Sequence, residues 1–294
     1  MADVSWRPVP RSRLAAAPAS RSPRWRWVPA AVVLGVLVGA ASVVPLVVDL
    51  DQQHVDLASA ARPPSVAHPF GTDELGRDVL LRCVHAFRVS LTVGLVAALV
   101  SAILGTAVGA LAGSVGGWVD RVLMRVVDAV ASVPHLLLGI VIVAALRPGL
   151  TAVILSIGLT HWLGSARIVR SEVLSLRNRP FVDAAIAGGS SRSRIVVRHL
   201  LPNVAPQVLL ATTLTVPHAV WHETALSFLG LGLPPHAASI GNMINDAQRS
   251  LLTGGWWMSL APGAVLVAAT LALAGIGGVW RDRLNPRRRS ELTW

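Results

Sequence analysis

FRVSLTVGLVAALVSAILGTAVGALAG, residues 87–113, is an apolar run that contains a single charged side chain, that of Arg88. A helix needs about 20 mostly apolar residues to cross the roughly 30 Å hydrocarbon core of a bilayer. A strand of a membrane β-barrel would instead alternate apolar and polar residues over shorter segments. The run therefore predicts a transmembrane α-helix.

The rest of the chain repeats this pattern. Apolar residues make up 53% of the 294 residues, charged residues make up 14%, and the mean hydropathy is +0.60. These values are typical of an integral membrane protein and exclude an ordinary water-soluble globule. The predicted fold class is all-α integral membrane with about six transmembrane helices: Val28–Val48, Phe87–Gly113, Val122–Leu146, Leu150–Ile168, Val204–Leu229 and Met258–Trp280.

The basic residues predict the orientation of these spans. All 26 are arginines, and about 20 of them lie in or beside the inner segments if the N-terminus is cytoplasmic. The positive-inside rule therefore places both termini in the cytoplasm. The net charge of +11 is explained by this bias and by attraction to anionic lipid, so we expect no nucleic-acid partner. The expected segments are a cytoplasmic tail 1–27, a first span 28–48, an extracytoplasmic segment 49–86, a transmembrane domain 87–280 with a cytoplasmic loop 169–203, and a basic cytoplasmic tail 281–294.

Two features within the spans predict how the helices pack. Gly105, Gly109 and Gly113 recur every four residues, which gives one helix face without side chains and favours close approach of a neighbouring helix or a partner subunit. Pro134 lies in the middle of the third span, where it should kink the helix. His135 follows it and is interpreted as a packed polar residue rather than a ligand.

The extracytoplasmic sequence HPFGTDELGRDVLLR, residues 68–82, predicts a short surface helix before the second span, with Thr72 or Asp73 as its N-cap. Its acidic residues lack the spacing of a calcium loop. The single cysteine, Cys83, permits no internal disulfide and has no metal-ligand spacing around it. We therefore expect no resident metal in this chain.

The loop between the fourth and fifth spans is too long to be a simple connection. It is about 35 residues, whereas two to eight usually join packed helices. Pro180 favours a helix start, Gly188–Gly189 a stop, and Ser190 or Ser191 can cap a second helix Arg192–Leu201 that Pro202 ends. The prediction is a helix–glycine–helix hairpin outside the bilayer.

The hairpin sequence VDAAIAGGSSRSRIVVRHLLPN resembles the EAA loop of inner-membrane permease subunits of bacterial ABC importers. The sequences HPFGTDELGRDVLLR, GGWVDRVLMRVVDAVASVPHLLL, ETALSFLGLGLPP and IGNMINDA are similar to the second, C-type permease of dipeptide, oligopeptide and nickel importers. The resemblance covers roughly residues 68–286. It departs from the family at Asp183, where Glu is usual, and at Gly188, where a larger residue is usual. The coupling residues that it implies are Asp183, Ala184, Ala185, Gly189, His199 and Pro202.

The resemblance implies a type I ABC importer permease fold that forms half of a translocation pathway for peptides or nickel. It implies a second permease, two ATP-binding subunits that dock on the hairpin, and an extracytoplasmic solute-binding protein as partners. The chain itself should catalyse nothing and hold no cofactor. The sequence supports this division of labour, because a P-loop requires a lysine and the chain has none.

An ion-coupled secondary transporter is the alternative. Such a carrier should place acidic residues inside its spans, near the midplane of the membrane. Asp128 and Glu223 are the nearest candidates. Asp128, however, follows Arg125 by three residues, which favours a local ion pair over an ion-binding role.

His218 and His222 are four residues apart and share one helix face, with Glu223 directly after them. Histidines at this spacing can bind zinc or nickel. The order H-E-x-x-H of zinc proteases is absent, so a membrane protease is not expected. The three residues are candidates for the substrate pathway, or else a polar patch that faces partner helices or water.

Overall fold

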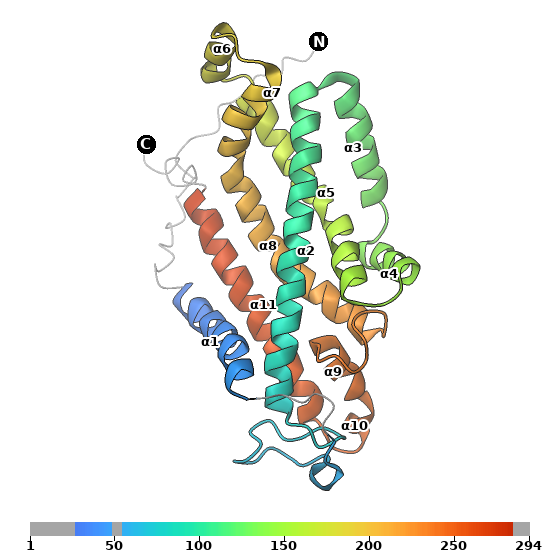
Figure 1. Cartoon of the computed structure of the whole chain (residues 1–294). Helices are drawn as coiled ribbons and strands as arrows, with labels where there is room; N and C mark the ends of the chain where they lie inside the picture. The colour runs from blue at the N-terminus through green and yellow to red at the C-terminus, as the bar shows by residue number, and fades with distance from the viewer. Residues whose placement is uncertain (1–26, 49–54, 285–294) are drawn as a thin grey trace, which may run out of the picture.

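The computed structural model describes residues 27–48 and 55–284, which form a bundle of helices (Figure 1). The all-α class is confirmed. The described residues form no β-strand, and one isolated β-bridge joins Thr72 to Asp78. The α-helices are α1 Trp27–Val47, α2 Val79–Val115, α3 Gly117–Ala131, α4 His135–Leu146, α5 Leu150–Leu176, α6 Pro180–Ala187, α7 Arg192–Ile195, α8 Leu201–Phe228, α9 Ile240–Asp246, α10 Gln248–Leu252 and α11 Trp257–Leu284; η2 Leu57–Ser59 is a 3-10 turn and η3 Val196–Leu200 is a π-helical turn.

Four helices in the described part of the chain are long and apolar enough to cross a membrane, namely α1, α2, α5 and α11. The pair α3 and α4 adds a fifth span if it is counted as one. The predicted span Val204–Leu229 corresponds to α8, whose 28 residues are long enough but include three prolines, two histidines and Glu223. Because α8 contacts α2, α5 and α11, much of its surface meets protein rather than lipid and can be polar.

α2 is the longest element and lies at the centre of the bundle, with α5 against it along much of its length. Its 37 residues span about 55 Å, so it extends beyond the hydrocarbon core. A Cβ atom on Gly105 would lie 2.5 Å from Cβ of Ser165, and one on Gly109 would lie 2.4 Å from the carbonyl oxygen of Ala166. The predicted close approach is confirmed, and the neighbour is α5 of the same chain.

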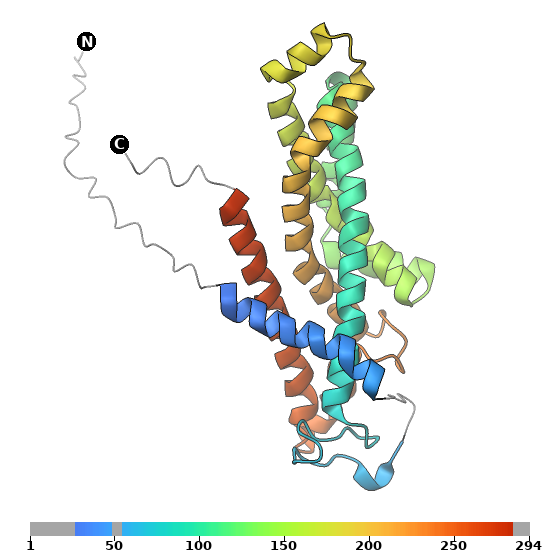
Figure 2. The same ribbon diagram turned by 60° about the vertical axis from the view of Figure 1, so that its left-hand side comes forward.

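α1 and α11 pack together at one side of this core. α1 crosses α11 and α2 obliquely at the edge of the bundle (Figure 2). Its main anchor is a small cluster in which Ala41 meets Phe87 of α2 and Ala269 of α11. Apart from Ala41, the residues of α1 are half-buried or exposed, and the exposed ones are mainly apolar, which is the surface expected of a helix that faces lipid.

The predicted kink at Pro134 is a complete break. The helix ends after Ala131, and α4 restarts at His135 at an angle of 89° to α3. Ser132 favours this ending, since its hydroxyl donates to the carbonyl of Ala129 and competes with the next helical turn. Pro134 then serves as the N-cap of α4 and has extended backbone angles.

The predicted surface helix in residues 68–82 is wrong. Asp73 takes part in a tight loop, in which its carboxylate accepts from the backbone N–H groups of Leu75 and Arg77. Gly71 and Gly76 both adopt positive φ, which right-handed helices exclude. The helix begins only at Val79, and Asp78 caps it by accepting from the N–H of Leu81.

Replacing Gly109 by Ala tests the contact between α2 and α5. The added methyl group must displace backbone of α5, so we expect a loss of about 1–3 kcal/mol in stability and a lower Tm of the purified protein in detergent. Gly164→Ala is the matched control, because nothing lies within 4 Å of its Cβ position and Ala favours a helix over Gly. Equal Tm values for the two variants would contradict the packing described here.

Candidate functional site

The hairpin projects from one end of the bundle, beyond the ends of α2 and α3 (Figure 1). We call residues 177–200, which include α6, α7 and η3, the elbow. Pro180 opens α6 as predicted, and the helix stops at Gly188, after which Gly189 has a φ of +78°. Ser191 caps α7, since its hydroxyl accepts from the N–H of Arg194. The predicted fold of the first half of the hairpin is confirmed.

The predicted end at Pro202 is wrong, because α7 continues through η3 into α8 without interruption. Proline lacks an N–H group and its ring clashes with the carbonyl four residues earlier. The π-helical turn widens the backbone at this place, and the N–H of Leu201 bonds to the carbonyl of Val196, five residues before it. Pro202 therefore lies in the first turn of α8, and α7, η3 and α8 form one continuous helical element.

An apolar cluster holds the elbow against the bundle. Val182 of α6 and Ile195 of α7 are buried against Val169 and Val173 of α5, together with Ala110 of α2. A displacement of the elbow must therefore move the ends of α5 and α8 with it, since packed interiors transmit strain.

The outer surface of the elbow is exposed. Asp183, Ala184 and Gly189 are exposed, as is Pro202 at the start of α8, while Ala185 and His199 are half-buried. Large apolar side chains accompany them, namely those of Phe181, Ile186 and Val197. Exposed apolar side chains grouped on one projection are typical of a protein-binding surface. Gly188 is not required by its backbone, because its φ is −75° and a Cβ would lie 3.4 Å from its nearest neighbour.

Two ion pairs fasten α3 to α5 near the elbow. Arg170 binds Asp120 in a bidentate pair that is half-buried, and its Nη2 atom lies 2.6 Å from Oδ2 of the aspartate. Arg167 lies 2.8 Å from Asp128 in a more exposed pair. The ion pair found at Asp128 is thus with Arg167, 39 residues away, and the predicted local pair with Arg125 is not the one formed.

Glu223 lies inside the bundle and is 0% exposed. Ser90 of α2 donates to its Oε2 atom at 2.5 Å, and Ser227 of α8 donates to Oε1 at 2.8 Å. Ser239, the N-cap of α9, is a third hydrogen-bond partner. Three elements therefore converge on one carboxylate, which the sequence alone did not reveal, because Ser90 is 133 residues away. Contact of Glu223 with substrate remains a prediction.

The predicted pair His218 and His222 lies on α8, and the structure brings two further histidines to it. The ring of His222 lies 4.6 Å from that of His161 on α5, measured between centroids, and His161 lies 5.7 Å from His135 of α4. Sequence reasoning interpreted His135 as a packed residue, but its side chain is exposed. His161 gave no signal, because its partners lie on other helices.

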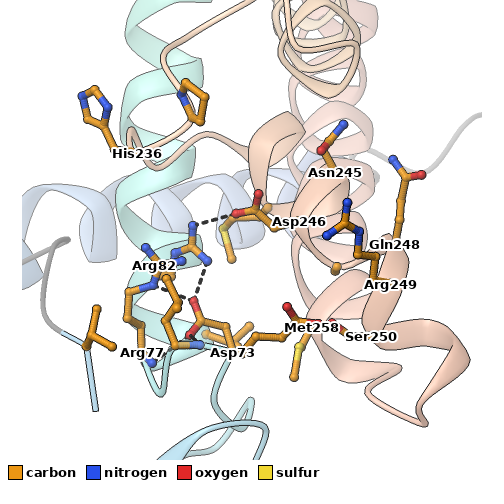
Figure 3. A pocket seen from close by; sticks show the side chains of 17 residues that line it. Asp73, Arg77, Arg82, His236, Asn245, Asp246, Gln248, Arg249, Ser250 and Met258 are labelled. Carbon is orange, nitrogen blue, oxygen red and sulfur yellow. Dashed lines mark hydrogen bonds and ion pairs between the residues drawn. The ribbon is translucent and has the colours of Figure 1, made fainter. Parts of the chain in front are cut away.

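A cavity of about 750 Å³ opens at the end opposite the elbow, between the 55–78 segment, α9 and α10 (Figure 3). Asp73 lies on its wall and accepts from Arg77 and Arg82 at 2.7 Å each, while Arg82 also reaches Asp246 at 3.4 Å. Glu74 accepts from the hydroxyl of Ser250 of α10. These contacts join the loop to α2, α9 and α10.

Residues 105–290 match the protein family described as "binding-protein-dependent transport system inner membrane component". This chain belongs to that family. Members of this family are inner-membrane components of transport systems. The apolar helices of this chain agree with a multi-pass protein of the inner membrane. The matched residues include the elbow, the histidines and Glu223.

Relatives of this family member include the dipeptide transport system permease protein DppC of Bacillus subtilis, which is 36% identical over 77% of this chain and 71% of the relative. The oligopeptide transport system permease protein OppC of the same organism is 34% identical over 88% and 84%. The nickel transport system permease protein NikC of Escherichia coli K12 is 38% identical over 92% and 97%. This chain is similar in fold to a chain of the MetNI methionine ABC transporter in an inward-facing conformation. The sequence identity is 20% and the TM-score is 0.53, over 69% of this chain and 95% of that chain.

Replacing Glu223 by Ala tests its role in the bundle. The change leaves three buried serine hydroxyls without their acceptor, at about 1–3 kcal/mol each, so we expect a clearly lower Tm. Glu223→Gln keeps the size and one acceptor oxygen and should lose less. An unchanged Tm with lost transport in both variants would instead indicate contact with substrate.

Proposed function

We propose that this chain is one permease subunit of an ATP-driven importer and forms half of the pathway by which peptides or nickel enter the cell. The observation that carries the proposal is the match to relatives named as dipeptide, oligopeptide and nickel permeases, each over more than two thirds of both chains. The exposed elbow gives such a subunit a surface for a cytoplasmic partner. In this proposal the chain lines the translocation pathway and catalyses no reaction itself.

The proposed partners are a second permease, two ATP-binding subunits and an extracytoplasmic solute-binding protein. The ATP-binding subunits would dock on the elbow, in the cytoplasm, through Phe181, Ile186 and Val197 around Asp183 and Gly189. The binding protein would approach the opposite end, where the 750 Å³ cavity and its charged wall lie. The arginine distribution supports this orientation, since the positive-inside rule predicts that the 169–203 region and both termini lie in the cytoplasm.

ATP-driven closure of the partner subunits would act on the bundle through the elbow. Because Val182 and Ile195 are packed on α5, and η3 joins α7 to α8, the force reaches two helices at once. Glu223 holds α8 to α2 and to the start of α9 farther along the bundle. Movement of the elbow would therefore tilt α5 and α8 about a fixed region, which is a rigid-body change of the kind that alternating access requires.

Ion-coupled transport is less well supported. The two acidic residues that could have served it are occupied by partners of this chain, since Asp128 pairs with Arg167 and Glu223 accepts from serines. Glu223 is fully buried, and Asp128 is exposed but paired with Arg167. The relatives, moreover, are named as parts of transport systems with a permease, and the family is described as dependent on a binding protein.

Gly189→Arg tests the docking of the ATPase. A large charged side chain on the exposed surface of the elbow should prevent co-purification of the ATP-binding subunits and reduce substrate-stimulated ATP hydrolysis at least tenfold. The measurement is a pull-down of the complex followed by an ATPase assay.

Gly254→Arg is the matched control. Like Gly189 it has a positive φ and open space at its Cβ position, but it lies between α10 and α11 at the other end. The control should retain the ATP-binding subunits, which separates backbone strain from docking. Equal retention of these subunits by both variants would contradict docking at the elbow.

A further inference from the structure

Four of the nine histidines of the chain gather where α4, α5 and α8 meet. We call His135, His161, His218 and His222 the imidazole cluster. The rings of His161 and His222 are perpendicular, with centroids 4.6 Å apart. His218 lies one turn before His222 and is close enough to act electrostatically on both rings.

Two groups of α5 lie within hydrogen-bond distance of one nitrogen of the His161 ring. Its Nδ1 atom lies 3.1 Å from the carbonyl oxygen of Ile157 and 3.0 Å from the hydroxyl of Thr160. In the tautomer that donates to the carbonyl, Nδ1 carries the hydrogen and Nε2 keeps a free lone pair. A histidine that binds a metal typically donates its other N–H to a carbonyl in this manner, because the bond orients the ring. In this tautomer His161 can act as a nitrogen ligand through Nε2.

The imidazole cluster extends from the interior of the bundle to its surface. His161 and His222 are half-buried, while His135 and His218 are exposed. A row of imidazoles would be unfavourable against lipid tails, so this face is suited to a polar passage or to protein. The groups that act on the rings of His161 and His222 are other histidines, while the neighbouring Glu223 is turned toward Ser90 and Ser227.

A site made of neutral imidazoles without a carboxylate favours some metal ions over others. They suit the divalent ions of nickel, copper, cobalt and zinc, whereas calcium and magnesium prefer oxygen ligands. Two imidazoles that share one ion at about 2.1 Å bring their ring centres to roughly 4–6 Å, and the separation of His161 and His222 lies in this range.

We propose that His161 and His222, flanked by His135 and His218, transiently bind a first-row transition-metal ion as it passes through the subunit. The transported ion is a complex that already carries small ligands of its own. The proposal rests on the proposed function and selects the metal-bearing class of cargo. In the described part of the chain no three metal-ligating side chains are arranged to hold an ion. Two protein ligands suffice for an ion that brings the others, and weak binding allows its release toward the next position.

The test is nickel binding by the full-length chain, purified with its partner subunits and a histidine-free affinity tag. Nickel chloride alone and nickel mixed with free histidine are titrated by calorimetry, which separates the bare ion from a chelate as the species bound. The double variant His161→Ala, His222→Ala should bind at least tenfold more weakly than the unchanged protein. Cu²⁺ bound as a probe should show coupling to imidazole nitrogens in its electron paramagnetic resonance spectrum, and the double variant should lose it.

His236→Ala is the matched control, because it removes an exposed histidine outside the imidazole cluster. It should bind nickel as the unchanged protein does. The double variant with Gln at both positions keeps side-chain bulk and hydrogen bonding, so it should lose nickel while retaining the Tm and the ATP-binding subunits.

Equal nickel affinity in the double variants and the unchanged protein would overturn the proposal. The same double variants are also assayed for uptake of nickel and of a dipeptide by cells. Equal losses of the two uptakes would likewise overturn the proposal, since they would indicate general recognition of polar cargo, such as a peptide carboxylate. Either result would leave the proposed function intact, because docking of the ATPase is tested separately at Gly189.

Discussion

The contact between the backbones of α2 and α5 is the constraint on which the rest of the structure depends. Gly105, Gly109 and Gly113 leave one face of α2 without side chains. Backbone and Cβ atoms of α5 therefore pack directly against the backbone of α2, with no room for a Cβ atom between them. In lipid there is little hydrophobic drive to bring helices together, and close packing supplies much of the attraction instead. This contact fixes α5, and α5 carries both His161 and the apolar seat of the elbow.

The two ends of the bundle are held by different chemistry. At the elbow, an apolar cluster and the bidentate pair of Arg170 with Asp120 connect short helices to long ones. At the opposite end, Asp73 and Arg82 join the 55–78 loop to the bundle, while Glu223 gathers serines from α2, α8 and the start of α9. The imidazole cluster adjoins this second set of contacts, since His222 directly precedes Glu223 in α8. A push on the elbow would therefore tilt α5 and α8, while the contacts of Glu223, Asp73 and Arg82 hold the opposite end.

Local patterns allowed much of this fold to be predicted from the sequence. Apolar runs identified the spans, the glycine spacing identified the packed face of α2, and Pro180 with Ser191 identified the starts of two elbow helices. The errors have physical causes. Pro202 was expected to end a helix, but a π-helical turn relieves its clash, and Asp73 was expected to cap a helix, but it closes a loop with Arg77.

Contacts between distant residues could not be predicted in this way. Glu223 and Ser90 are far apart in the sequence, and neither residue has a pattern that indicates the other. The same holds for Asp128 with Arg167, where a nearby arginine was the more obvious partner. His161 joins His222 only because α5 and α8 lie side by side, and the fold has to be known before that cluster can be seen.

The central claim is that the elbow lies in the cytoplasm, where a separate ATPase can reach it. Cys83 is the single cysteine of the chain and is buried, so an introduced cysteine supplies the one reactive thiol. The measurement is labelling of Ala187→Cys on the elbow and of Leu252→Cys, which is 92% exposed at the other end, with a membrane-impermeant maleimide in cells whose outer envelope admits it. The cells express the chain without its ATPase partners, which would shield the elbow. The account predicts that position 252 is labelled in intact cells and that position 187 is labelled only after the inner membrane is opened. Labelling of position 187 from outside would contradict it.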